Sequence, residues 1–241
     1  MSVLTVTLLT LTILFVSTLT RSTFGFGDAL IAMPLLSLII GVQTATPLVA
    51  FVAPTIALTI VWSNWRSINL NATWRLIISS LIGIPVGVLV LKTAPEEIVK
   101  SFLGLAIILV SLYNLAKPRL MTLTQQKWAY LFGFVAGVLG GAYNTNGPPV
   151  VIYGALNRWP PERFRATLQG YFLPTGLFIL VGHGLGGLWT VQVLRLYALA
   201  LPVVLIAILL GGKLNRRISP GRFEKFIYMT LVGLGLLLLV R

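Results

Sequence analysis

The sequence predicts an all-α polytopic membrane protein made of two inverted repeats of about five apolar segments each, with short or broken helices where the repeats meet. Three observations support this prediction. Of the 241 residues, 57% are hydrophobic and only 10% are charged, which is too little polar surface to cover a soluble globule. Apolar runs near the length of a bilayer crossing recur along the whole chain. A similar glycine- and proline-containing break occurs twice, about a hundred residues apart.

Ten apolar runs approach the roughly 17–25 residues that a transmembrane helix needs. The second and the seventh are short, follow a Gly-rich break and contain or begin with proline, so each is a half-helix, a re-entrant piece or a kinked span. The first has no basic residue before it and no A-x-A cleavage site, and is therefore interpreted as a helix and not a signal peptide. The runs are expected at 3–20, 27–41, 47–63, 75–91, 98–116, 128–143, 148–157, 167–182, 194–212 and 225–240.

The positive charges predict how the chain is oriented. If all ten runs cross, 14 of the 18 lysines and arginines lie on one side, which is cytoplasmic by the positive-inside rule and places both termini outside. If the second and seventh runs are re-entrant, the ratio falls to 11 against 7, so ten crossings are favoured. Five crossings per half is an odd number. The first membrane repeat, 1–120, and the second, 121–241, are therefore expected to be inverted within a single integral membrane domain.

The two breaks, at residues 25–28 and 140–149, are the predicted site. A helix that begins inside a membrane exposes up to four unpaired backbone N–H groups and the positive end of its dipole. A small anion is the natural occupant, and neutral groups are expected to hold it because no arginine or lysine is expected to be buried in the apolar runs. The alternative is that the glycines serve close helix packing. Breaks at matching places in two halves favour a transporter binding site between the repeats.

Several side chains near the breaks are candidate ligands. Asn144 and its neighbours offer amide and hydroxyl groups that can bind an oxyanion or cap the next helix. Asp28 can be a proton-coupling carboxylate or, as we favour, the N-cap of the second run. Gln169 can face the bundle interior or bond a neighbouring helix, and His183 is expected in a solvated loop. The predicted substrate-binding residues are Gly25, Gly27, Asp28, Tyr143, Asn144, Thr145, Asn146, Gly147, Pro148 and Gln169.

The composition argues against several other functions. The chain has no cysteine, one histidine and five acidic residues, so no metal, cofactor or enzymatic nucleophile–base pair is expected. The net charge of +13 can suggest nucleic acid, but the cations lie in short stretches between apolar runs, which indicates membrane orientation instead. An ion channel is the main alternative to a transporter, although segments such as 101–112 offer almost no polar residues for a continuous polar path.

The second half carries a Gly140-Gly141 pair, then Asn146-Gly147-Pro148-Pro149, and then the stretch Phe-Arg-Ala-Thr-Leu at 164–168. This pattern resembles the sulfite exporter TauE/SafE family of membrane proteins. The first half is similar to the family's glycine motif at residues 25–27 and at 34–36. Asn144, Asn146 and Asp28 stand where the family usually has glycine, and the added amide donors suit a substrate with more hydrogen-bond acceptors than sulfite.

The resemblance implies a secondary transporter or permease of the bacterial inner membrane for sulfite, organosulfonates or related sulfur-containing or carboxylate anions. Alternating access is the expected mechanism, and an anion channel is the alternative. The expected partners are a small anionic substrate and the lipid bilayer, with a proton or sodium as candidate coupling ion. A homo-oligomer is compatible with the sequence, and a nucleic-acid partner is not expected.

Overall fold

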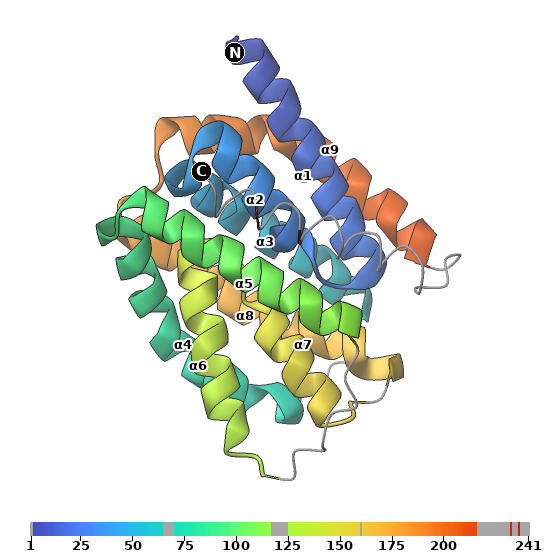
Figure 1. Cartoon of the computed structure of the whole chain (residues 1–241). Coiled ribbons are helices and arrows are strands. Elements are labelled where there is room, and N and C mark those ends of the chain that lie inside the picture. Colours follow the sequence, from blue (N-terminus) through green and yellow to red (C-terminus); the bar gives the residue numbers. More distant parts are fainter. Residues whose placement is uncertain are drawn as a thin grey trace.

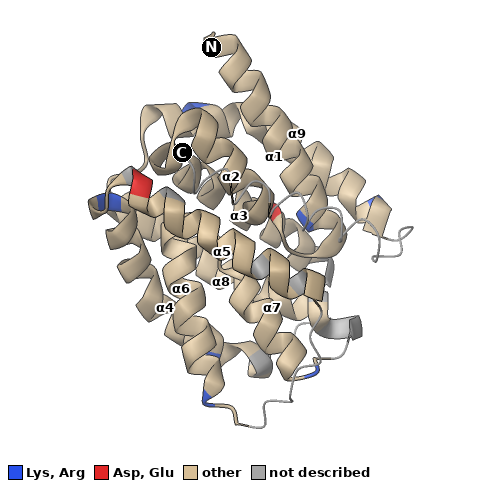
Figure 2. Cartoon of the chain, viewed as in Figure 1, with Lys and Arg blue, Asp and Glu red and all other residues tan. Residues whose placement is uncertain are grey.

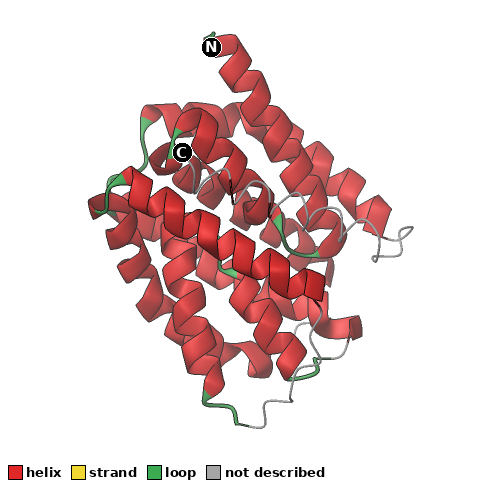
Figure 3. Cartoon of the chain, in the orientation of Figure 1, coloured by secondary structure: helices red, strands yellow, loops and turns green. Residues whose placement is uncertain are grey.

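The described secondary structure is helical, and the connections that the structure describes in full are short (Figure 1, Figure 3). The structure is a computed structural model that describes residues 2–64, 70–116, 125–159 and 161–215, together with residues 232 and 236. The helices in these ranges are α1 (Val3–Phe24), α2 (Asp28–Ile40), α3 (Val42–Asn64), α4 (Leu70–Thr93), α5 (Glu96–Ala116), α6 (Trp128–Tyr143), α7 (Gly147–Leu156), α8 (Pro161–Leu185) and α9 (Val191–Asn215).

Each of the first nine predicted runs coincides with one of these helices, which confirms the all-α class, whereas the run at 225–240 lies outside the described residues. Among the described residues, α1, α9 and the parts of α3 and α4 at 42–62 and 73–93 are long and apolar enough to cross a bilayer. Most of the charged positions drawn in Figure 2 lie at or near helix ends. The chain is therefore a multi-pass membrane protein.

Both predicted breaks are real interruptions between consecutive helices. α1 ends at Gly25, whose φ of 92° is left-handed, and α2 starts after Gly27, whose φ is 98°. Glycine adopts these angles without steric cost, which explains why two glycines frame this turn. The second break turns instead at Asn144, with a φ of 57°, between α6 and α7. Asparagine is one of the few other residues that tolerate this conformation.

The packing of the helices does not follow the order of the chain. One apolar core joins α1, α2, α3, α5 and α9 with the ends of α4 and α6, and a second joins α4, α6, α7 and α8. A third, smaller core joins α3, α4 and α8. The two most extensive helix pairs are α4 with α6 and α1 with α9, and both pairs lie side by side in Figure 1. The fourth helix of the first half therefore packs with the second half, and the fourth helix of the second half packs with the first.

Glycines allow α4 and α6 to approach until their backbones touch. Gly133, Gly137 and Gly141 recur every four residues on α6, and a Cβ at any of them would collide with backbone atoms of α4. Gly83 and Gly87 do the same from α4 toward α6. This glycine face, defined by these five residues, fixes the end of α6 that leads into the second break.

Candidate functional site

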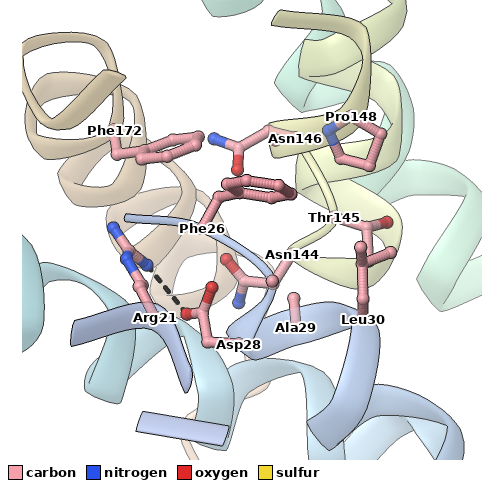
Figure 4. Close-up of a pocket in the computed structure, with 12 residues that line it drawn as sticks. Arg21, Phe26, Asp28, Ala29, Leu30, Asn144, Thr145, Asn146, Pro148 and Phe172 are labelled. Carbon is pink, nitrogen blue, oxygen red and sulfur yellow. Dashed lines mark hydrogen bonds and ion pairs between the residues drawn. The ribbon is translucent and has the colours of Figure 1, made fainter. Parts of the chain in front are cut away.

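A small buried cavity lies where the two breaks meet (Figure 4). Its volume is about 20 Å³, little more than the roughly 10–15 Å³ that one water molecule needs. A sulfite-sized anion therefore requires side chains to move before it can enter. The lining residues come from α1, α2, α8 and the second break: Arg21, Phe26, Gly27, Asp28, Ala29, Leu30, Asn144, Thr145, Asn146, Gly147, Pro148 and Phe172.

The structure brings most of the predicted site residues to this cavity. Gly25, Tyr143 and Gln169 do not line it. Gly25 caps α1, Tyr143 belongs to the apolar core, and Gln169 accepts a hydrogen bond from Arg21. Direct contact between a ligand and any of the predicted site residues stays a prediction. The predicted residues that do line the cavity are Gly27, Asp28, Asn144, Thr145, Asn146, Gly147 and Pro148.

The expectation that only neutral groups surround the site is wrong. α1 continues past the predicted end of its run to Phe24, so Arg21 lies inside the last helical turn and not in a connection. Its side chain is 4% exposed and lines the cavity. The guanidinium packs over the Phe172 ring, 4.8 Å from the ring centre, an arrangement that stabilises a buried cation.

Arg21 is the centre of a buried polar network. Its Nη1 donates to Oδ2 of Asp28 at 2.8 Å, and its Nη2 donates to Oε1 of Gln169 at 3.2 Å. The amide nitrogen of Gln169 donates in turn to the carbonyl oxygen of Gly25, so Gln169 joins α8 to the first break. The Nε–H of Arg21 has no hydrogen-bond partner among the described residues. A buried donor without a partner is costly, and a bound anion would satisfy it.

Asp28 is not the N-cap that the sequence suggested. Gly27 takes the N-cap position of α2, without a side-chain cap, and Asp28 is the first helical residue. Its carboxylate pairs with Arg21 (Figure 4). The backbone N–H groups of Asp28, Ala29 and Leu30 have no partner within α2, because the first turn of any helix leaves its donors free. This end of α2 therefore directs N–H groups and a positive dipole end toward the cavity.

The start of α7 supplies fewer donors than the start of α2. Asn146 is its N-cap, and Pro148 and Pro149 follow Gly147 in the first turn. Proline has no N–H, so Gly147 is the main backbone donor of that turn. The two breaks are therefore unequal as candidate anion sites, with α2 and Arg21 carrying most of the donors.

The polar side chains of the second break are held by neighbouring helices. The amide of Asn144 donates to the carbonyl oxygen of Thr46 at 3.0 Å, and the amide of Asn146 donates to the hydroxyl of Thr175 at 3.2 Å. Asn144 caps the end of α6 and not the start of α7. Each amide nitrogen carries a second N–H that these bonds do not use, so both asparagines can still donate to a ligand.

The prediction of a solvated loop for His183 is also wrong. His183 lies within α8, is fully buried, and its Nε2 is 2.8 Å from the carbonyl oxygen of Gly141. It thus ties α8 to the last turn of α6 and has no place in the cavity wall. The sequence pattern missed this position because the surrounding glycines, taken as a loop signal, pack closely inside the helical bundle.

The fold and the cavity define a polytopic helical membrane protein with a buried polar site at two helix breaks. The profile of the sulfite exporter TauE/SafE family matches residues 9–238, and the chain belongs to this family. The chain is also 28% identical over 170 residues to a probable sulfite/organosulfonate exporter TauE of Cupriavidus necator. That alignment covers 67% of this chain and 66% of the relative, just under two thirds of its length. No solved structure matches the chain.

Proposed function

We propose that the protein is a secondary transporter that carries sulfite, organosulfonates or related small anions across the bacterial inner membrane by alternating access. The observation that carries this proposal is the free Nε–H of buried Arg21 in a cavity that also receives the first turn of α2. A guanidinium fork and a helix N-terminus are the two commonest means by which proteins hold oxyanions. Membership of the TauE/SafE family and the name of the C. necator relative support a sulfur-containing anion.

The packing pairs support a two-fold internal repeat, which we propose is inverted and is the basis of alternating access. If α1 to α4 correspond in order to α6 to α9, then the contact of α1 with α9 corresponds to the contact of α6 with α4, and both contacts are extensive. The contact of α3 with α9 likewise corresponds to that of α8 with α4, and both are present. Internal prolines recur at corresponding helices, with Pro54 in α3 and Pro174 in α8. Two repeats around one central site are the usual architecture of a rocking carrier.

The size of the cavity favours a carrier over an anion channel. A channel needs a continuous polar path, whereas this cavity has room for about one or two water molecules. Counterflow separates the two mechanisms. Proteoliposomes loaded with unlabelled methanesulfonate are expected to accumulate labelled methanesulfonate transiently, because only a carrier exchanges one molecule for another. Dissipation of the label gradient without overshoot would instead indicate a channel.

Inverted repeats place the starts of the two halves on opposite faces of the membrane. The natural chain has no cysteine, so a single introduced cysteine reports its own position. Val3→Cys, at the start of α1, and Gln126→Cys, just before α6, are both at exposed positions. In intact cells a membrane-impermeant maleimide is expected to label Val3→Cys only, and Gln126→Cys is expected to react after permeabilisation. Labelling of both from the same face would contradict the inverted repeat.

Replacing Asn146 is expected to weaken anion binding without unfolding the chain. One hydrogen bond to a charged ligand contributes roughly 1.5–3 kcal/mol, so Asn146→Ala is expected to raise the Kd for methanesulfonate by about tenfold or more. Asn157→Ala is the matched control, because Asn157 caps the other end of α7 and does not line the cavity. The affinities are measured by isothermal titration calorimetry. Equal affinities of the two variants would show that Asn146 does not bind the anion.

A further inference from the structure

We propose that Asp28 is a proton-binding site coupled to anion binding. In the empty carrier its carboxylate neutralises Arg21 from the Nη1 side, and when the substrate anion binds the free Nε–H the carboxylate takes up one proton. The step forms one O–H bond on Asp28 and breaks one O–H bond of a hydronium ion or buffer acid in the surrounding water. The ion pair between Arg21 and Asp28 then becomes a contact between the guanidinium and a neutral carboxylic acid. The inference rests on the proposed function and names its coupling ion as a proton.

The charge balance of the cavity supports this coupling. Among the described residues Arg21 and Asp28 are the only charged ones that line it, and both are buried, at 4% and 9% exposure. The charges of the described lining therefore cancel in the empty site, and an added sulfonate would leave two anions sharing one cation. Two anions a few ångströms apart in a poorly solvated site repel strongly, and the weaker acid then takes up a proton. A carboxylic acid is weaker than a sulfonic acid, so the proton goes to Asp28.

The donors on Arg21 show where the anion can bind. Nη1 is occupied by Asp28 at 2.8 Å and Nη2 by Gln169 at 3.2 Å, while Nε has no partner. The Nε–H lies on the same side of the planar guanidinium as Nη2, so an anion on Nε gains its second bond by replacing the neutral Gln169 oxygen on Nη2. Asp28 stays on Nη1, where its carbonyl oxygen still accepts after the carboxylate has taken up a proton.

Few other ionisable groups face the Arg21–Asp28 pair. α2 packs against α1, α3 and α5, and α1 contributes Arg21 itself while α3 has no charged residue. α5 carries its charges near its start, at residues 96, 97 and 100, and a tyrosine at 113. From α8 the neighbours are Gln169 and Phe172, which do not titrate. The second break adds Asn144, Thr145 and Asn146, which are also neutral. Within the described part of the chain, the carboxylate of Asp28 is therefore the group that we propose as the proton acceptor.

Calorimetry of the purified full-length protein tests the coupling directly. Methanesulfonate is the probe, because its strong acid group keeps one charge throughout the titration. Binding is measured in two buffers with different ionisation enthalpies, and the difference in observed heat gives the number of protons taken up. We expect close to one proton per anion bound near neutral pH. The affinity is expected to fall by up to tenfold for each unit that the pH rises, as linkage requires.

The variant Asp28→Asn keeps a side-chain oxygen for Arg21 but cannot take up a proton. It is expected to show no proton uptake and the same Kd at about pH 6 and about pH 8, whereas the natural chain shows the linked dependence. Lys213→Gln, an exposed position at the end of α9 that does not line the cavity, is the charge control and is expected to behave as the natural chain.

The outcomes separate the two proposals. Binding by the natural chain without proton uptake, or with a dependence on sodium in place of pH, would overturn the proton coupling and leave anion transport intact. Binding of neither methanesulfonate nor sulfite at any pH would overturn the proposed function itself. The titration of the natural chain needs no variant, so the inference remains testable if Asp28→Asn does not fold.

Discussion

Arg21→Gln, introduced together with Asp28→Asn, is expected to abolish measurable binding of methanesulfonate. The double variant removes both charges of the buried pair, so it leaves no uncompensated carboxylate in the bundle. Compared with Asp28→Asn alone, it lacks only the guanidinium, which we expect to give the anion two charge-assisted hydrogen bonds. At roughly 1.5–3 kcal/mol each, their loss corresponds to an increase in Kd of about a hundredfold or more.

The comparison is made by calorimetry after the folded state of each variant has been checked by circular dichroism and size-exclusion chromatography. Lys213→Gln serves again as the control for the loss of one positive charge. If the double variant is folded and binds methanesulfonate as tightly as Asp28→Asn does, Arg21 does not hold the anion and the site lies elsewhere.

Gly137→Leu is expected to prevent the close packing of α4 against α6. A Cβ at Gly137 would already collide with backbone atoms of Ser80, and backbone cannot rotate away as a side chain can. Overpacking in a well-packed core typically costs about 1–3 kcal/mol, and a branched side chain between two backbones is expected to exceed that range. The expected result is a strongly lowered melting temperature in detergent, or protein that aggregates on extraction.

Gly212→Leu is the matched control, because a Cβ built at Gly212 on α9 meets no described atom within 4 Å beyond its chain neighbours and its own helical backbone. Both substitutions replace a helical glycine by a good helix former and raise helix propensity alike. Their difference therefore isolates the contact between helices. Equal melting temperatures for the two variants would show that α4 and α6 are not packed through the glycine face.

The helices of this protein could be predicted from the sequence because a bilayer demands long apolar segments. The two breaks could be predicted as well, since glycine, asparagine and proline at 25–27 and 144–149 are incompatible with a continuous helix. The packing of α4 against α6 and of α9 against α1 could not be predicted from the sequence. Hydrophobicity predicts that a helix is buried in lipid or protein, but it does not predict which helix packs against it. The glycine spacing on α6 was the available signal, and it predicts a contact face of α6 without identifying the helix that packs there.

The lining of the cavity was predicted in part, but its central cation was missed. Asp28, Asn144 and Asn146 were selected because they are polar residues beside breaks, and they do line the cavity. Arg21 was assigned to a connection because a cation at the end of an apolar run usually lies at the membrane surface. The signal that could have found it is the acid seven residues later across a glycine turn, which allows the two side chains to meet. Phe172 carried no signal, since an aromatic residue in an apolar helix usually belongs to the core.

The exchange of fourth helices sets the order in which the protein can be completed during synthesis. α1 leaves the ribosome first, but α9, its main partner, starts about 170 residues after α1 ends. At about 5–20 residues per second, α1 stays without this partner for roughly 10–35 s. A nascent chain can thus enclose α6–α8 around α4 while its own N-terminal helix still lacks its main partner. The residues that line the cavity come from α1, α2, α8 and the second break, so all of them are synthesised before α9 begins. A chain that stops before α9 therefore contains the whole cavity lining but leaves the α9-facing side of α1 without its partner helix.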